Sequence, residues 1–179
     1  MGSPGPVHEG RVEDFWAEVI EALLSKIVSG GQTGADRAAL DWAINRGKAH
    51  GGWCPKGRKA EDGTIDRRYN LVETPSEDYS QRTEWNVRDS DGTAVFSIRR
   101  ELQGGSLLTV ELADKYNKPV IRLRQEDEQT NHALELRSFI EEFGISVLNV
   151  AGPRESDEPG VYRFVSRVLD QALGDTQRC

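Results

Sequence analysis

The stretch SGGQTGAD, residues 29–36, joins a short apolar run to a segment with helical spacing, and it decides the fold. Its three glycines let the backbone turn sharply and approach a ligand closely. A helix that starts here presents free N–H groups and the positive end of its dipole to an anion. The spacing matches neither the dinucleotide-binding pattern GxGxxG nor a Walker loop that ends in Gly-Lys-Ser/Thr. We therefore expect a phosphate-binding turn, with a plain tight turn as the alternative. The residues expected to bind are Gly30, Gly31, Gln32, Thr33 and Gly34.

A second glycine-rich turn, Gly104-Gly105-Ser106, repeats this arrangement between a later apolar run and a later helix. Backbone N–H groups in such a turn form a second seat for an anion, and Thr109 lies one turn further along the helix. A turn without a ligand is again the alternative. Two such turns in one sheet predict a ligand with a phosphate at one end and a flat or polar group elsewhere.

Outward from these turns, strands and helices alternate along the chain. The apolar runs are residues 26–29, 93–98, 120–123 and 145–150, and the helical patterns are residues 36–45, 80–89, 106–116, 136–143 and 161–169. Short continuous apolar runs are typical of parallel strands that are buried on both faces. We therefore predict an α/β protein with a Rossmann-like, doubly wound parallel sheet and helices on both faces. Such a sheet binds ligands at the carboxyl ends of its strands. Residues 51–74 are expected to form a loop.

Three regions divide the chain. Residues 1–8 are rich in Gly and Pro and are expected to be a disordered tail. Residues 9–25 contain an N-terminal amphipathic helix, because apolar residues recur at helical spacing from Val12 to Leu24, with Trp16 among them. Residues 26–179 are expected to form one Rossmann-like domain.

Composition excludes several classes of function. The 179 residues carry a net charge of −7, and this argues against a nucleic-acid-binding face. The sequence shows neither a run of about 20 apolar residues nor a signal peptide, so we expect no membrane segment. Two cysteines cannot form a disulfide framework, so a reducing cytoplasm is the expected location. Three scattered histidines give no metal-ligand spacing, and we expect no metal site.

Three further segments carry candidate binding residues. Trp53 could stack on a ring, and Lys56 and Arg58 in the same segment could bind oxyanions. The other candidates are Arg82, Trp85 and Asn86 before the second apolar run and Arg154 after the last one. For each of them a purely structural role is the alternative: a core or anchoring position for the tryptophans, and a solvated loop or helix surface for the polar residues.

Four segments resemble a known family: SGGQTGADRAALDWAI (29–44), HGGWCPKGRKAEDG (50–63), RTEWNVRDSDGTAVFSI (82–98) and LNVAGPRESDEPGVY (148–162). They are similar to the molybdenum carrier proteins, also called molybdenum cofactor carrier proteins, over residues 26–173. That family is related to Rossmann-like proteins misnamed lysine decarboxylases, a superfamily that includes phosphoribohydrolases.

The resemblance implies a carrier or storage protein for the molybdenum cofactor (molybdopterin, a phosphorylated pterin dithiolene) or another phosphorylated heterocycle. It also implies a homo-oligomer, a dimer or tetramer, with molybdoenzymes as further partners. No catalytic residue is then required.

One alternative is a hydrolase, because the phosphoribohydrolase motif PGGxGTxxE is matched in part. Gly104, Gly105 and Glu111 match it, whereas Gln103 and Leu107 depart from it. Arg82 and Glu111 would then be the catalytic pair. A nucleotide-sensing regulatory protein is the other alternative.

Overall fold

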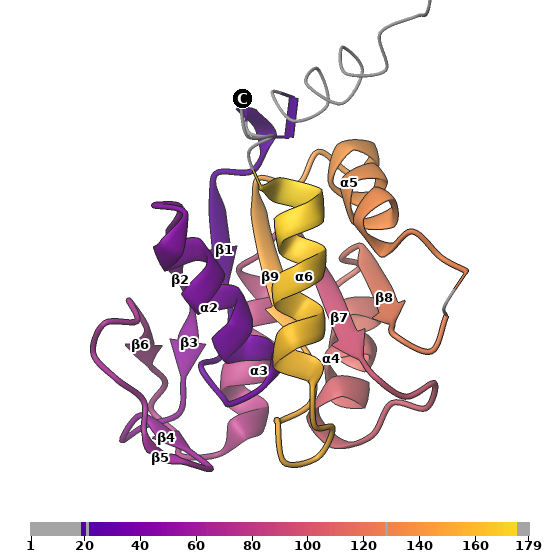
Figure 1. Ribbon diagram of the computed structural model, residues 1–179. Coiled ribbons are helices and arrows are strands. Elements are labelled where there is room, and N and C mark those ends of the chain that lie inside the picture. The colour runs from indigo at the N-terminus through magenta and orange to yellow at the C-terminus, as the bar shows by residue number, and fades with distance from the viewer. Residues whose placement is uncertain (1–18, 21, 128, 175–179) are drawn as a thin grey trace, which may run out of the picture.

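The computed structural model describes residues 19–20, 22–127 and 129–174. A five-stranded sheet with the order β2-β1-β9-β7-β8 forms its centre, and all of its strand pairs are parallel (Figure 1). The strands are β1 (Lys26–Val28), β2 (Ala49–Gly51), β7 (Gly92–Ser97), β8 (Val120–Arg124) and β9 (Val147–Ala151). All six residues of β7 are buried, which explains why this strand reads as a continuous apolar run.

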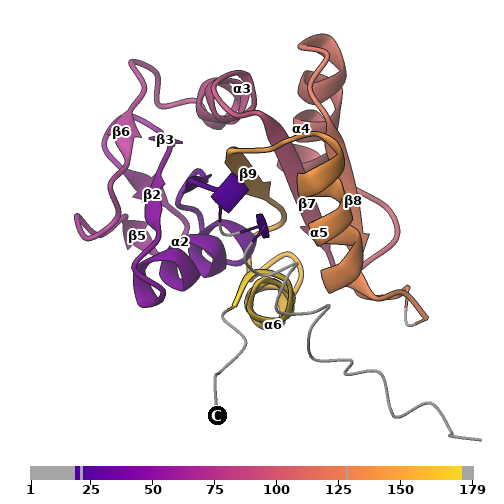
Figure 2. The same cartoon turned by 90° about the horizontal axis from the view of Figure 1, so that it is seen from above.

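Helices cover both faces of the sheet, as Figure 2 shows. On one face lie α2 (Ala35–Asn45), α5 (His132–Glu142) and α6 (Val161–Leu173), and on the other lie α3 (Tyr79–Arg88) and α4 (Gly104–Lys115). This arrangement confirms the predicted Rossmann-like α/β fold. No helix among the described residues is long and apolar enough to cross a bilayer.

The largest apolar core lies between the sheet and the α2–α5–α6 layer. Phe96 of β7 packs edge to face on Phe164 of α6, with 5.7 Å between the ring centroids. The sequence predicts an apolar stripe on α6, and this stripe packs in the same core. Its residues are all buried: Val161, Phe164, Val165, Val168 and Leu169.

The start of the chain joins the same core. Ile20 and Leu24, from the end of the predicted N-terminal helix, are buried in it. The disordered tail expected at residues 1–8 and the greater part of that helix, with Trp16, lie outside the described residues.

The segment predicted to be a loop, residues 51–74, contains two pairs of short strands that the prediction missed, although most of its residues lie outside strands. It follows the edge strand β2, and within it β3 (Trp53–Cys54) pairs with β6 (Val72–Glu73). A small hairpin is formed by β4 (Lys59–Ala60) and β5 (Gly63–Thr64). These strands are two residues long and carry no repeating apolar pattern, which explains why the sequence does not reveal them.

The connections place the loops that matter at one edge of the sheet. Strand β9 lies between β1 and β7, so the carboxyl ends of these three strands are neighbours. The helix α2 leads from β1 outward to β2, whereas α4 leads from β7 outward to β8 in the opposite direction. The connections therefore diverge at the centre of the sheet, where an open α/β sheet binds its ligands.

Candidate functional site

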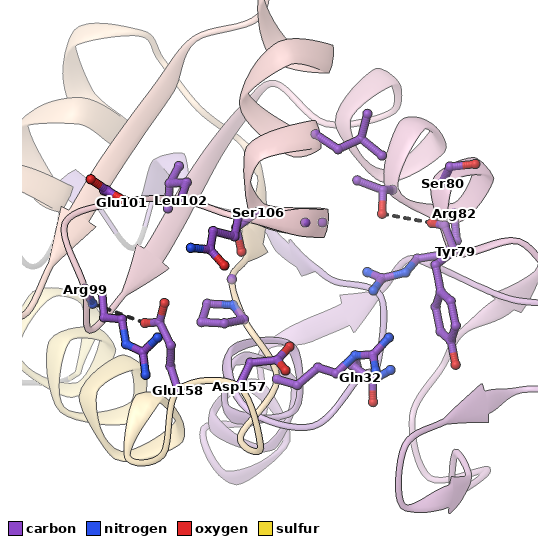
Figure 3. Close-up of a pocket in the computed structure, with 18 of the residues that line it drawn as sticks. Gln32, Tyr79, Ser80, Arg82, Arg99, Glu101, Leu102, Ser106, Asp157 and Glu158 are labelled. Atoms are coloured by element: carbon purple, nitrogen blue, oxygen red, sulfur yellow. Dashed lines mark hydrogen bonds between the residues drawn. The ribbon is translucent and has the colours of Figure 1, made fainter.

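A cavity of about 1030 Å³ lies at this edge of the sheet, between the N-terminal ends of α3 and α4. Four loops at the strand ends contribute to its wall: Gln32 after β1, residues 99–103 after β7, Glu126 after β8, and residues 152–154, 157 and 158 after β9. Figure 3 shows Tyr79 and Arg82 on one side, Arg99 and Glu158 on the other, and Ser106 between them. The volume is at the upper end of the range for small-molecule sites, roughly 300–1,000 Å³.

The N-terminus of α4 forms one wall of the cavity. Gly104, Gly105 and Ser106 all line it, and the first-turn hydrogen bonds that Ser106 and Leu107 donate go to the carbonyl of Gln103. No described side chain caps this helix, and its first turn contains no acidic residue. The backbone N–H groups of Gly104 and Gly105 therefore lie at the positive end of a helix dipole, and the first turn of the helix itself supplies no carboxylate to neutralise it.

Both glycines leave this wall open. An ideal Cβ at Gly104 or Gly105 would meet no atom within 4 Å. Gly104 needs to be glycine for its backbone, because its φ is +53°, whereas Gly105 has an ordinary φ. The absence of a side chain at Gly105 is thus not required by local packing, and it leaves the helix end accessible to a ligand.

The first glycine-rich turn has a different environment. The N–H of Gln32 donates to the Asp36 carboxylate over 3.3 Å, and the N–H of Thr33 donates to the Gln32 side-chain oxygen over 3.0 Å. Asp36 lies in the first turn of α2 and is 2% exposed. We expected a ligand phosphate on the amides of this turn, but the N–H groups of Gln32 and Thr33 already donate to the chain's own side chains.

Close packing, rather than a ligand, explains two of the glycines in this turn. An ideal Cβ at Gly34, where φ is +76°, would lie 2.5 Å from the carbonyl oxygen of Pro153. At Gly30 it would lie 1.8 Å from Nη1 of Arg82. A larger side chain at Gly34, as in Gly34→Val, would therefore displace the loop after β9.

The remaining residues of this turn also face protein. Gly31 adopts a φ of +80°, and its Cβ would lie 2.6 Å from Leu71. The hydroxyl of Thr33 donates to Glu61 of the β4–β5 hairpin, which also accepts from Ser156. Of the five residues predicted in this turn, Gln32 alone lines the cavity.

Arg82 projects from α3 to the junction between the cavity and the first turn. Its Nη1 donates to Asp36 over 2.9 Å, and the two side chains are 14% and 2% exposed. Burial raises the pKa of the Asp36 carboxyl, while the positive charge of Arg82 acts in the opposite direction. The pair fixes the guanidinium group at the cavity wall.

The aromatic residue of the cavity is Tyr79, which the sequence analysis did not single out. The guanidinium carbons of Arg82 and Arg154 lie 5.9 and 5.4 Å from the centre of its ring. Tyr79 precedes Arg82 by three residues at the start of α3, so both lie on one face of the helix. The three-residue spacing between Tyr79 and the predicted Arg82 could have indicated Tyr79 as a cavity residue. Arg99 and Arg100 were also missed, because nothing in their spacing distinguishes them from a solvated loop.

Trp53, Trp85 and Asn86 do not line the cavity. The tryptophan rings pack edge to face, with 4.7 Å between their centroids. The side chain of Asn86 accepts from the backbone N–H of Trp53 and donates to its carbonyl oxygen. These residues attach β3 to α3, which is the structural alternative that the sequence left open.

Lys56 and Arg58 also lie outside the cavity. The Arg58 guanidinium group donates to the carbonyl oxygens of Ile65, Asp66, Tyr69 and Leu71 over 2.8–3.1 Å. The Arg58 guanidinium group therefore holds the backbone of residues 58–71 in place and does not bind an oxyanion of a ligand in the cavity.

We expect Arg58→Met to lower the free energy of unfolding by at least about 2 kcal/mol, because several carbonyl groups lose a charged donor. Urea denaturation measures this, and hydrogen exchange of residues 58–71 locates it. The matched control is Lys56→Met, which removes an exposed positive charge from the same segment. An unchanged unfolding midpoint for Arg58→Met would contradict the assigned role.

Two other predicted residues, Thr109 and Glu111 of α4, do not line the cavity. The hydroxyl of Thr109 donates to the carbonyl of Gly105 over 2.7 Å, so Thr109 supports the first turn from behind. Glu111 is exposed and does not line the cavity. The proposed catalytic pair of Arg82 and Glu111 is therefore not assembled, because the carboxylate that contacts Arg82 is Asp36.

The cavity has mixed charge. Its wall includes four arginines and five acidic residues: Arg82, Arg99, Arg100, Arg154, Asp78, Glu101, Glu126, Asp157 and Glu158. The Glu158 carboxylate accepts from the backbone N–H groups of Ile98 and Arg99, so it is already used in closing the end of β7. No group of three or more potential metal-binding side chains occurs among the described residues.

The fold is Rossmann-like, and a large cavity lies at the carboxyl edge of its sheet. Residues 27–173 match the model of the circularly permutated YpsA SLOG family, and the chain belongs to that family. The chain is also similar to a crystal structure from Syntrophus aciditrophicus, named as a candidate molybdenum carrier protein. The two share 46% identity with a TM-score of 0.81, over 84% of this chain and 96% of the other. A comparison with curated proteins found no significant match.

Proposed function

We propose that this protein binds a small phosphorylated ligand that carries a heterocycle, and that it carries or stores this ligand. The observation that supports the proposal best is the N-terminus of α4. Gly104 and Gly105 line a large cavity, and no described side chain caps their helix. A phosphate there would accept from backbone N–H groups at the positive end of a dipole, without a lysine.

The rest of the wall suits the remainder of such a ligand. Arg82 and Arg154 lie at the side of the cavity where the Tyr79 ring also lies, so charged and aromatic groups are available to a ring. The acidic residues on the wall can accept from N–H groups of a heterocycle. A net charge of −7 does not exclude an anionic ligand, because helix-end amides can bind a phosphate without help from the net charge.

The related protein is named as a molybdenum carrier, and within this proposal the ligand is the molybdenum cofactor. Its phosphate would lie on the amides of Gly104 and Gly105, and its pterin would lie toward Tyr79 and Arg82. When bound, the cofactor would supply its metal on the dithiolene sulfurs, and the chain would bind the pterin phosphate and exclude water. Molybdoenzymes would be the recipients, and the expected homo-oligomer is part of the same proposal.

Ligand extraction tests the proposal on the protein as purified. Native mass spectrometry should show a bound mass that denaturation releases, and metal analysis of the same sample should show molybdenum if the ligand is the cofactor. A phosphorylated heterocycle without molybdenum would support the binding role and contradict the cofactor assignment. Protein that copurifies with no small molecule, and that binds neither inorganic phosphate nor phosphorylated heterocycles, would contradict both.

A further inference from the structure

Two buried hydrogen-bond donors beside the cavity have no acceptor. They are Nε2 of Gln32 and Nε of Arg82, and neither has a partner among the described residues. Gln32 is 4% exposed, and both residues line the cavity. Buried donors without acceptors are rare in folded proteins because each one forfeits its hydrogen bonds to water. Two of them at one wall therefore point to an acceptor that a ligand supplies.

The structure fixes which atom of Gln32 is the donor. Its side-chain oxygen accepts from the backbone N–H groups of Thr33 and Glu61, over 3.0 and 2.9 Å. Exchanging the oxygen and nitrogen of this amide would place N–H groups against both of these N–H donors. The nitrogen is therefore the atom left for a ligand.

The guanidinium group of Arg82 is fixed in a similar way. Its Nη1 donates to Oδ2 of Asp36, and the backbone N–H of Gln32 donates to the same oxygen. The absence of a side chain at Gly30 makes room for this nitrogen. Gln32, through its backbone N–H, and Arg82, through its guanidinium group, thus contact one carboxylate, and we treat Gln32, Asp36 and Arg82 as one cluster.

We propose that this cluster recognises the edge of the ligand's ring, and that the edge presents two acceptors, a carbonyl oxygen beside an unprotonated ring nitrogen. A 6-oxopurine has this edge in O6 and N7, whereas a 6-aminopurine replaces the carbonyl with an amino donor. An oxidised 4-oxopterin presents the same pair of acceptors. The inference rests on the proposed function, since it concerns the ring of the same phosphorylated ligand.

The test compares IMP with AMP, which carry the same phosphate and ribose, by isothermal titration calorimetry with the full chain. In AMP the N7 acceptor remains, but the donor that would meet O6 faces an amino group instead. One hydrogen bond is then lost and two donors oppose each other, so we expect IMP to bind about tenfold or more tightly than AMP. The monophosphate of 6-hydroxymethylpterin forms a third arm. Whichever of IMP and this pterin binds more tightly identifies the source of the oxo edge, and either result supports the proposal.

Two variants separate edge recognition from phosphate binding. Gln32→Glu retains an oxygen for the N–H groups of Thr33 and Glu61 but replaces the donor with an acceptor, so the preference should shift toward AMP. Arg82→Lys retains a positive charge for Asp36 but removes Nε–H, so the preference should shrink. Inorganic phosphate should bind both variants as it binds wild type. Glu111→Gln, an exposed change of the same type on α4, should leave every affinity unchanged.

Three results would overturn the inference. The first is that AMP binds wild type as tightly as IMP does. The second is that folded Gln32→Glu and Arg82→Lys keep the wild-type preference for IMP over AMP. The third is that these variants lose inorganic phosphate binding as much as they lose IMP binding, which would place the phosphate on this cluster. If wild type binds none of the four probes, the proposed function itself fails, and that outcome is distinct from the other three.

Discussion

Gly105→Asp is expected to abolish phosphate binding without weakening the fold. The new carboxylate would lie at the N-terminus of α4, where a Cβ meets no atom within 4 Å. At that position it would occupy the site proposed for the ligand phosphate. Two unit charges about 4 Å apart repel by about 4 kcal/mol at the effective dielectric of a protein surface. The affinity for IMP should therefore fall by about two to three orders of magnitude.

The same change should stabilise the helix. Gly105 is the second residue of α4 and has an ordinary φ, so any L-residue fits its backbone. Replacing a glycine inside a helix gains about 0.5–1 kcal/mol, and a carboxylate in the first turn gains roughly 0.3–1 kcal/mol. A variant that melts no earlier than wild type yet fails to bind would separate the site from the fold.

Gly105→Asn is the matched control, because it has the same shape without the charge. Calorimetric titration of both variants with IMP, together with thermal melting, measures the two effects. The asparagine variant should lose less affinity than the aspartate variant. Equal affinity of Gly105→Asp and wild type for IMP would show that no phosphate binds at this helix end.

Arg82→Ala is expected to lower the free energy of unfolding by about 3–5 kcal/mol, the usual cost of removing one partner from a buried ion pair. The cost arises because the carboxylate of Asp36, 2% exposed, would keep its charge without the compensating guanidinium group. For a chain of this length the change corresponds to a fall in the melting temperature of about 10 °C or more. IMP binding should also be lost, since Arg82 lines the cavity.

A second substitution should restore much of that stability. In Arg82→Ala/Asp36→Asn the uncompensated charge is absent, and the asparagine oxygen can still accept from the N–H of Gln32. We expect the double variant to be more stable than Arg82→Ala by about 1–3 kcal/mol. If it is equally unstable or less stable, the lost packing of the arginine, not the unpaired charge, is the cause.

The stability deficit of Arg82→Ala should also depend on pH. Burial already raises the pKa of Asp36, and removing Arg82 raises it further. Between the unfolded pKa, about 3.9, and this raised value, the folded state binds more protons than the unfolded state. Stability therefore falls as pH rises through that window. The deficit relative to wild type should be smaller at pH 5 than at pH 8, and Asp36→Asn in the double variant should remove the difference.

The main sheet was predictable because burial on both faces leaves a strong pattern. Strand β7 is buried at every position, and the runs that became β1 and β9 are similarly short and mostly buried. The edge strand β8 leaves a weaker pattern, because only Leu123 of its residues is buried. The segment after residue 48 was not predictable, since its order depends on long-range contacts. The clearest case is Arg58, whose four carbonyl partners lie seven to thirteen residues away and leave no local signature.

The candidate site was predicted in part, for a related reason. Glycine-rich turns at strand ends identify the correct edge of the sheet, and Gln32, Arg82, Gly104, Gly105, Ser106 and Arg154 all line the cavity. The sequence could not show which turn remains open, because that depends on Asp36 facing back onto its own helix start. It could not distinguish Trp53 from Tyr79 as the aromatic wall either, since both stand among polar residues.

The most direct measurement is a crystal structure of the full chain grown with IMP. The account predicts the phosphate within hydrogen-bond distance of the backbone N–H groups of Gly104 or Gly105, at the N-terminus of α4. Two results would contradict this prediction. One is a phosphate on the amides of residues 31–34, and the other is IMP that binds only outside this cavity, at an occupancy comparable to that of the protein.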